Sequence, residues 1–436
     1  MNLSKRPVVE IHIANTLPEP IELVGIKVEQ NNIEKFIPAE KLAHLAGDQS
    51  DPLWLPAKKT RRPLQYVSFM PPRDVSLDAP PPSEKLSIKV VVKAITDGEA
   101  FTYPVFYRYF SSLNRLASRP KYPAMGKLLS QHPFLKLEKN LVIRIQPGTW
   151  NVLGNLLIPP GYTLKIDNSV VLRFEKDAIF VTSSSTQFQG SLDNPVVFEP
   201  IGDSWGGFAA LQAGESQWKH VQVKGASNVR RGGWALTGGL TFFKSDIHMN
   251  NVNITNSLGE DALNIVNSKF QIEHSTISDT VSDALDADFS QGKIDQCVFK
   301  NIGGDAIDFS GSKIKVTHSY FKNIQDKAIS AGEASQVTGM GLEVVKSGIG
   351  IASKDASLVE ISDSTLREIR GAALSAFLKK NEYNEGGVIN AKGMTIINVG
   401  KTSQAQEGSK ILLDGRLMPA EKFSTDQMYT AEKSKK

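Results

Sequence analysis

A short acidic phrase recurs at a fixed interval in the middle of the chain. It appears as Asp261-Ala-Leu-Asn264, Asp283-Ala-Leu-Asp286 and Asp305-Ala-Ile-Asp308, and it returns with lysine in first place as Lys327-Ala-Ile-Ser330. Carboxylates that repeat in this way could bind a hard cation such as Ca²⁺, which prefers oxygen ligands. They could also exchange protons with a bound substrate.

Either chemistry requires the copies to lie close together. If the copies stack as parallel strands, equivalent side chains lie about 4.8 Å apart and form columns. The alternation of side chains predicts that Leu285 and its equivalents point inward, so that the acids three residues after the first position point outward. The candidate metal ligands are Asp261, Asp283, Asp286, Asp288, Asp305 and Asp308.

The repulsion between carboxylates in such a column must be offset, because two carboxylates at this spacing repel by about 3.5 kcal/mol at an effective dielectric near 20. Bound cations, hydrogen bonds from turn amides or raised pKa values would each supply it. A structural alternative is that these aspartates cap backbone N–H groups in a repeated turn. Capping would explain the acids at the first position of the repeated phrase (the first column), but it does not require acids at the fourth position (the second column).

Three further residues are candidates for chemistry. Lys327 could act as the base of a Ca²⁺-dependent polysaccharide lyase or uronate epimerase, or it could form a salt bridge with Asp305, which the neighbouring acid favours. Trp205 and Trp218 could stack on sugar rings or belong to the core.

Hydrolysis of the polygalacturonase type is disfavoured, because Ala306 stands where that family has a second adjacent acid.

The repeat predicts the elements that carry these residues. Between about residues 135 and 403, short apolar segments alternate with Gly, Pro and Asn turns, and no helical period appears. Each 22-residue unit holds about three short strands, which cannot bury their apolar side chains alone but can do so when stacked. We therefore predict an all-β chain with a right-handed parallel β-helix over 135–403. The competing leucine-rich repeat lacks its LxxLxLxxN/C phrase.

The sequences GEDALNIVNSKF, SDALDADFS, GGDAIDFSGS and DKAISAGEAS resemble the turns of the pectate-lyase-like superfamily of parallel β-helix proteins. More narrowly, they resemble the β-helix regions that follow CotH-type kinase-like domains in bacterial surface proteins. This resemblance implies a secreted or cell-surface protein and an upstream CotH-like domain as a partner.

The remaining segments divide the chain into further parts. Residues 1–113 alternate apolar and polar side chains between Pro and Asn turns, which predicts a small antiparallel β-sandwich-like module. We expect a linker over 114–134. Residues 404–436 are rich in Lys, Glu, Ser and Gln, and we expect a polar, partly disordered tail.

Composition narrows the classes of function. A net charge of +4, from 50 basic and 46 acidic residues, disfavours a nucleic-acid binder. A single cysteine, Cys297, excludes an intramolecular disulfide framework. No apolar run is long enough to span a membrane. The first residues lack a secretory signal, so we expect either a cytoplasmic protein or a fragment whose export signal lay upstream.

These observations leave three functions open. The first is an extracytoplasmic protein that binds or processes a polysaccharide or cell-surface glycan along the acidic face. The second is a non-catalytic structural or adhesive module. The third is a Ca²⁺-dependent lyase or epimerase, with Ca²⁺ as the only expected cofactor.

Overall fold

The computed structural model describes two compact units, which divide between Ser118 and Arg119. The described residues are 9–13, 21–30, 33–39, 43–44, 54–55, 65–69, 86–94, 100–105, 122–231 and 234–424. In this part of the chain, no helix is long and apolar enough to cross a membrane.

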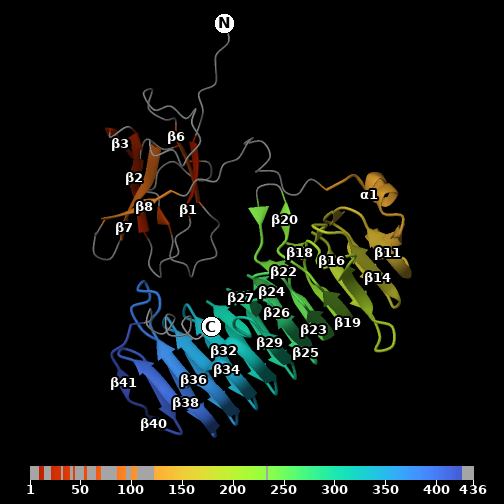
Figure 1. Cartoon of the computed structure of the whole chain (residues 1–436). Coiled ribbons are helices and arrows are strands. Elements are labelled where there is room, and N and C mark those ends of the chain that lie inside the picture. The colour runs from red at the N-terminus through yellow and green to blue at the C-terminus, as the bar shows by residue number, and fades with distance from the viewer. Residues whose placement is uncertain are drawn as a thin grey trace. The chain divides into compact units, whose positions relative to one another are not determined.

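The N-terminal unit contains two antiparallel sheets, as the alternating sequence predicts (Figure 1). One sheet has the order β1 (Val9–Ile13), β6 (Gln65–Phe69) and β4 (Ala43–His44). The other has the order β3 (Ile33–Pro38), β2 (Ile21–Gln30), β7 (Leu86–Ala94) and β8 (Ala100–Pro104), and β5 (Trp54–Leu55) pairs with β2.

The second unit is a solenoid of about 12 turns, in which each turn contributes strands to three parallel sheets (Figure 1). Sheet 1 contains β10 (Val142–Ile145), β13 (Thr163–Ile166), β16 (Ser185–Gln189), β25 (Lys269–Glu273), β28 (Gln291–Asp295), β31 (Lys313–Thr317), β33 (Gln336–Met340), β35 (Leu358–Ser362), β37 (Val388–Lys392) and β39 (Lys410–Leu413). Sheet 2 contains β11 (Gly148–Val152), β14 (Val170–Phe174), β17 (Val196–Pro200), β26 (Thr276–Thr280) and β29 (Val298–Ile302).

Sheet 3 carries the acidic repeat. Its strands are β12 (Leu156–Ile158), β15 (Phe180–Thr182), β18 (Phe208–Leu211), β22 (Gly238–Phe243), β24 (Asp261–Val266), β27 (Asp283–Asp288), β30 (Ile307–Ser310) and β41 (Ala420–Glu421). Six long strands bend from one sheet into the next: β19 (Ser216–Lys224), β23 (Ile247–Thr255), β32 (Tyr320–Gly332), β34 (Glu343–Lys354), β36 (Thr365–Phe377) and β38 (Thr395–Gln406).

The turn from sheet 2 to sheet 3 depends on residues that tolerate a left-handed backbone. Asn301 and Asn323 have φ values of 56° and 57° there, a conformation in which asparagine is favoured over most residues. Their amides also link successive turns: Asn323 Nδ2 donates to Asn301 Oδ1 at 2.9 Å, and Asn301 Nδ2 donates to Asp279 Oδ1 at 2.8 Å.

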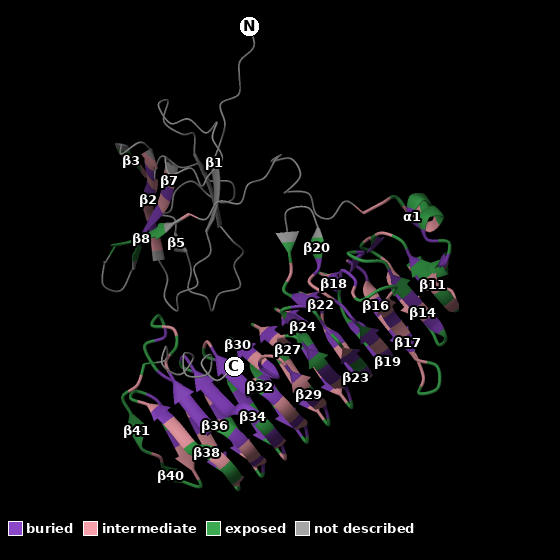
Figure 2. Ribbon diagram, viewed as in Figure 1, coloured by how far each residue is buried: buried purple, intermediate pink, exposed green. Residues whose placement is uncertain are grey.

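The interior of the solenoid is one continuous apolar core (Figure 2). Within it, serines bridge successive turns, because the backbone N–H of Ser290 donates to Ser312 Oγ at 2.9 Å and that of Ser312 donates to Ser335 Oγ at 3.0 Å. These hydroxyls satisfy buried amides at the corners, where the strand ladder is interrupted.

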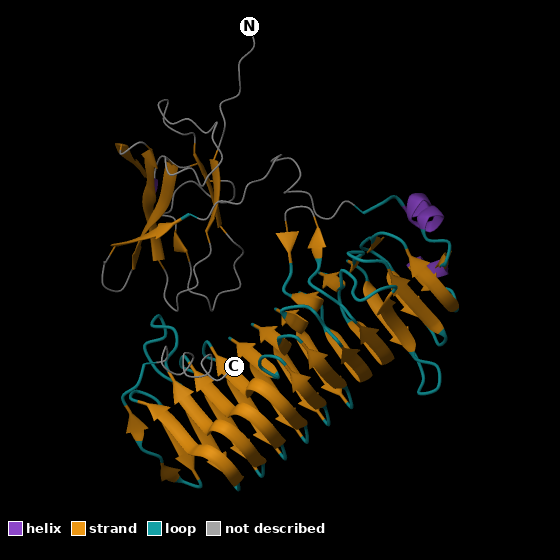
Figure 3. Cartoon of the chain, in the orientation of Figure 1, coloured by secondary structure: helices purple, strands orange, loops and turns teal. Residues whose placement is uncertain are grey.

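The ends of the solenoid differ from the expected boundaries (Figure 3). Helix α1 (Met125–Gln131) and β9 (Leu135–Glu138), which pairs antiparallel with β10, lie at the first turn, so part of the expected linker is helical. Strands continue past residue 403 through β38, β39, β40 (Arg416–Leu417) and β41, because apolar residues such as Ile411 still enter the core. The rest of the expected tail, residues 425–436, lies outside the described residues, as do residues 106–121.

Candidate functional site

The first acidic column does cap backbone amides. Asp261 and Asp283 are register partners on β24 and β27. The Oδ1 atom of Asp283 accepts the N–H of Asp305 at 2.8 Å, and the Oδ1 atom of Asp305 accepts the N–H of Lys327 at 2.8 Å. Each of these two carboxylates therefore holds the next turn in place, which is the structural role that the sequence left open.

The second column forms in the predicted register and faces away from the core. Asn264 pairs with Asp286, Asp286 with Asp308, and Asp308 with Ser330 on successive strands of sheet 3. Asp286 and Asp308 are half-buried, and Asn264 Nδ2 donates to Asp286 Oδ2 at 3.3 Å. We call Asn264, Asp286, Asp308 and Ser330 the outer column.

The pKa values of the acids in and near this column are shifted in opposite directions from the usual value. Burial, and then the charges of Asp288 and other nearby acids, raise the pKa of Asp286 to about 9. Burial and Asp305 raise the pKa of Asp283 to about 7, and burial raises the pKa of Asp261 to about 6. Burial would also raise the pKa of Asp308, but Lys354, the hydrogen bond from Ser330 and the charges of Lys327 and Lys379 together outweigh burial and hold that pKa below the usual value.

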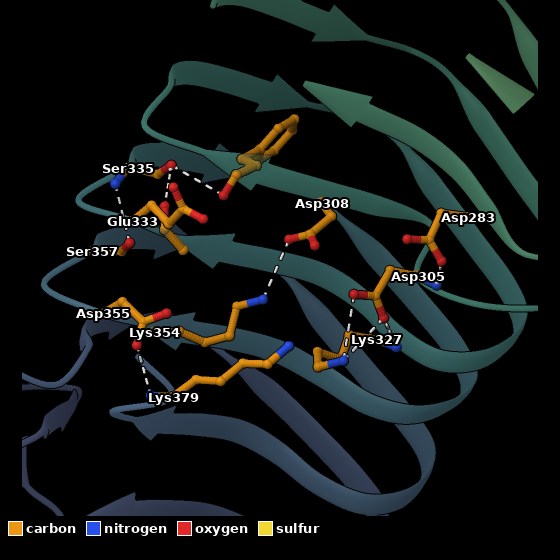
Figure 4. A network of polar contacts seen from close by, with 12 residues as sticks. Asp283, Asp305, Asp308, Lys327, Glu333, Ser335, Lys354, Asp355, Ser357 and Lys379 are labelled. Carbon is orange, nitrogen blue, oxygen red and sulfur yellow. Dashed lines mark hydrogen bonds and ion pairs between the residues drawn. The ribbon is translucent and has the colours of Figure 1, made fainter. Parts of the chain in front are cut away.

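Two lysines supply positive charge at the C-terminal end of the column (Figure 4). The Nζ atom of Lys327 lies 3.2 Å from Asp305 Oδ1 and 2.6 Å from Asp326 Oδ2, and its side chain is only 4% exposed. The Nζ atom of Lys354 lies 3.5 Å from Asp308 Oδ1. The salt bridge predicted between Lys327 and Asp305 is therefore present.

The geometry of Lys327 contradicts its alternative role as a base. Two carboxylates favour the charged ammonium, and the side chain is almost fully buried. A base must reach the proton of a bound substrate and be neutral when it does so. The sequence-based prediction of Lys327 as the base of a lyase or epimerase is therefore wrong.

The predicted sugar platform is also wrong. Trp205 and Trp218 are 0% and 1% exposed. Trp205 stacks on Phe174 with ring centroids 4.2 Å apart, and Trp218 lies 5.0 Å from Phe188 in the core. Each indole N–H has an internal acceptor, Lys224 O and Thr186 Oγ1 respectively. No face of either ring is open to a sugar.

Three of the predicted metal ligands do come together. Oxygen atoms of Asp283, Asp305 and Asp308 lie within 4.8 Å of one another. Two of these carboxylates already hold backbone amides, and lysine ammonium groups contact two of them. A divalent cation would thus find about three oxygens here and would compete with Lys327 and Lys354.

Two residues of the site were missed by the sequence analysis. Lys354 lies two residues after Ala352, which pairs with Ser330 at the regular 22-residue step, and Lys379 follows the end of β36. A search for repeated acids passes over both lysines. Figure 4 shows their side chains extending from neighbouring turns toward Asp308 and Lys327. The insertion after Ala372, which carries Lys379, was the available signal.

A polar groove of about 880 Å³ runs along the corner between sheets 2 and 3. Asn301, Asn323, Lys346, Glu368 and Asn398 line it, one from each of five successive turns. Gly303 and Gln325 also line it, two residues before Asp305 and Lys327 respectively. The groove therefore borders the acidic columns over several turns.

The family comparison agrees with this geometry. Residues 261–408 match the family model described as the right handed beta helix region. The protein contains a right-handed parallel β-helix. The matched segment includes every residue of the outer column, so the predicted fold class is confirmed.

Several solved structures are similar to this chain at low sequence identity. The catalytic unit of a GH87 alpha-1,3-glucanase from Streptomyces thermodiastaticus is 11% identical, with a TM-score of 0.46, 96% of this chain covered and 86% of that one. A mutant of the periplasmic alginate epimerase AlgG is 9% identical, with a TM-score of 0.40 and coverages of 70% and 89%. The Dettilon tailspike protein is 8% identical, with a TM-score of 0.35 and coverages of 62% and 56%. No curated protein sequence matches the chain.

Proposed function

We propose that the β-helix binds and processes a polysaccharide on sheet 3, with Asp286 as the proton donor and Asp308 as the ionised partner. The observation that carries this proposal is the register pairing of two outward aspartates whose pKa values are displaced in opposite directions. Two carboxyl groups with opposed pKa values are the usual basis of acid–base catalysis in one site.

The spacing is compatible with cleavage of a glycosidic bond. Register partners on adjacent parallel strands lie about 4.8 Å apart, close to the separation of about 5–5.5 Å between the carboxyl groups of retaining glycosidases. At neutral pH, Asp286 would hold a proton for the leaving oxygen, while Asp308 would present a negative charge to the developing positive charge on the sugar ring.

The surroundings suit a long polar ligand. The groove at the corner between sheets 2 and 3 is open, extends over several turns and is lined by amide and charged groups. Sugar hydroxyls can both donate to and accept from such groups. This supports an extended glycan as the ligand, and we extend the proposal to an extracytoplasmic location, where such polymers occur. An upstream CotH-like domain remains a prediction from the resemblance.

The test uses purified protein with a panel of neutral and acidic polysaccharides. We expect wild-type protein to release reducing ends or unsaturated products from one of them, and Asp286→Asn or Asp308→Asn to slow this by about 10²–10⁴-fold. Asp193→Asn, an exposed acid on a loop, is the matched control. Equal activity of the Asp286 and Asp308 variants and wild type would overturn the proposal.

A second candidate is a Ca²⁺ site, favoured by the close approach of Asp283, Asp305 and Asp308. Burial raises the pKa of Asp283 to about 7, so Ca²⁺ binding would release protons at that pH. We expect the heat of Ca²⁺ binding to depend on the ionisation enthalpy of the buffer. If millimolar Ca²⁺ produces no heat of binding, there is no Ca²⁺ site, and the role of these acids is to cap backbone amides.

A further inference from the structure

One position along the groove between sheets 2 and 3 alternates between glycine and a long polar side chain. On successive turns it is occupied by Gly303, Gln325, Gly348, Arg370 and Gly400. A Cβ atom at any of the three glycines would lie within 2.6 Å of a backbone oxygen of the preceding turn, so these turns carry no side chain here. Gln325 and Arg370 therefore supply the side chains of this position.

The side chain of Arg370 is exposed, lines the groove and reaches back over two turns. Its Nη2 atom donates to the backbone oxygen of Gln325. Gly348, on the turn between them, leaves room for this path, because a Cβ atom there would lie 3.3 Å from Nη2. A guanidinium carries five N–H donors, and among the described residues Gln325 is the one that accepts from it. The fold therefore holds the guanidinium in place and leaves most of its donors for a ligand.

The groove has more positive than negative side chains. Lys346 and Arg370 line it, and Glu368 is the one carboxylate among the residues that line it. Glu368 Oε2 lies 3.7 Å from Lys346 Nζ, and Glu368 Oε1 lies 3.3 Å from Arg367 Nη1. In the part of the chain that the structure describes, no ion pair at this corner involves Arg370. Glu368 is thus compensated by two other cations, and the charge of Arg370 remains for a ligand.

The guanidinium reaches close to the proposed catalytic pair without joining it. Gln325, whose backbone oxygen it contacts, belongs to the turn that follows the one carrying Asp308. Successive turns lie about 4.8 Å apart. Asp326, the acid next to Gln325, contacts Lys327 Nζ at 2.6 Å. A group held by Arg370 would therefore belong to a sugar unit beside the one at Asp308.

We infer that Arg370 binds an anionic group of the glycan in this groove, so that the ligand is an acidic polysaccharide. This inference rests on the proposed function for the identity of the ligand as a glycan. A carboxylate and a sulfate group share the required chemistry, because the planar guanidinium can donate two parallel, charge-assisted hydrogen bonds to either of them.

The experiment compares wild type, Arg370→Gln and the matched control Arg416→Gln, which removes an exposed arginine from β40. Binding is measured with polygalacturonate for carboxylate, dextran sulfate for sulfate, and dextran as a neutral glycan. We expect Arg370→Gln to bind at least one acidic polymer about tenfold more weakly or worse, with dextran and the control unaffected. The polymer affected identifies which anion is bound. Equal affinity of wild type and Arg370→Gln for both acidic polymers, or no binding of either by wild type, would overturn the inference.

Two further measurements separate binding from other roles of Arg370. A lower melting temperature of Arg370→Gln with unchanged affinity for both acidic polymers would show that the residue only holds the corner together, and would contradict the inference. Arg370→Lys keeps the charge but loses the fork, so we expect its affinity to lie between those of wild type and Arg370→Gln. If Asp286→Asn keeps full activity while Arg370→Gln loses affinity, the proposed catalytic pair fails and the anion site stands.

Discussion

Asp286 and Asp308 are chemically identical residues whose environments give them opposite behaviour. Asp286 is surrounded by other acids, whereas Asp308 lies next to Lys354. The difference arises within one turn of the solenoid, since Asp288 and other acids lie near Asp286 whereas Lys354 reaches Asp308. The candidate acid and its ionised partner are therefore assigned by position rather than by residue type.

The raised pKa of Asp286 predicts a pH-dependent stability. The folded state binds the extra proton between about pH 4, the unfolded value, and about pH 9, so the free energy of unfolding falls as pH rises through this window. We expect Asp286→Asn to melt above wild type at pH 9, with the difference shrinking toward pH 4. A difference of about 1 kcal/mol shifts the melting temperature by about 2–4 °C.

Asp308→Asn serves as the comparison, because its lowered pKa acts with the opposite sign. Its ionised form stabilises the folded protein above the unfolded pKa, so we expect this variant to melt below wild type at pH 7. Thermal scans from pH 4 to 9 check both. A pH-independent offset for Asp286→Asn would contradict the assignment.

At the scale of elements, the segment 378–387 shows how an insertion becomes part of a site. Asp355 on the turn after β34 accepts two of its amides, and Glu333 on the turn after β32 holds Lys380 and Tyr383. The insertion is thus attached to two preceding turns, and the regular repeat supplies the acids that anchor it.

Removing the Asp355 carboxylate should loosen this segment. Asp355→Ala leaves two N–H groups without their acceptor, at a cost of about 1–3 kcal/mol each where they stay buried. We expect faster amide hydrogen exchange at Lys379 and Lys380, with exchange in sheet 1 unchanged. Glu382→Ala, an exposed residue of the same segment, is the control. Unchanged exchange at both lysines would show that the segment does not depend on Asp355.

At the scale of the whole β-helix, stability comes from contacts between successive turns. Phe299 and Phe321 illustrate this, because their rings stack with centroids 5.0 Å apart and planes within 5°. Each turn buries its apolar side chains only against its neighbours. Damage to a central turn should therefore weaken the solenoid on both sides.

Phe321→Ala tests this coupling. Its side chain is fully buried, so we expect a loss of about 3–5 kcal/mol in the free energy of unfolding, measured by urea denaturation with circular dichroism. Ile397→Ala, at a position 56% exposed, should stay within about 0.5 kcal/mol of wild type. A loss below 1 kcal/mol for Phe321→Ala would contradict strong coupling between turns.

The sequence by itself determined the fold and the register of the acidic repeat. The 22-residue interval requires strands that stack turn on turn, and stacking places Asn264, Asp286, Asp308 and Ser330 in one column. Local periodicity suffices for this, because each turn contacts mainly the next. The same reasoning named the salt bridge of Lys327 but could not choose between it and a catalytic base.

Only the tertiary structure decided which of these residues are exposed and what charge surrounds them. Trp205 and Trp218 are core residues. Their local sequence does not show this, because the rings that cover them belong to other turns. Lys354 and Lys379 join the site because the fold brings their side chains beside Asp308 and Lys327, which a search for repeated acids does not anticipate. Burial and the neighbouring charges depend on atoms brought together from many turns, and they give Asp286 and Asp308 opposite pKa shifts.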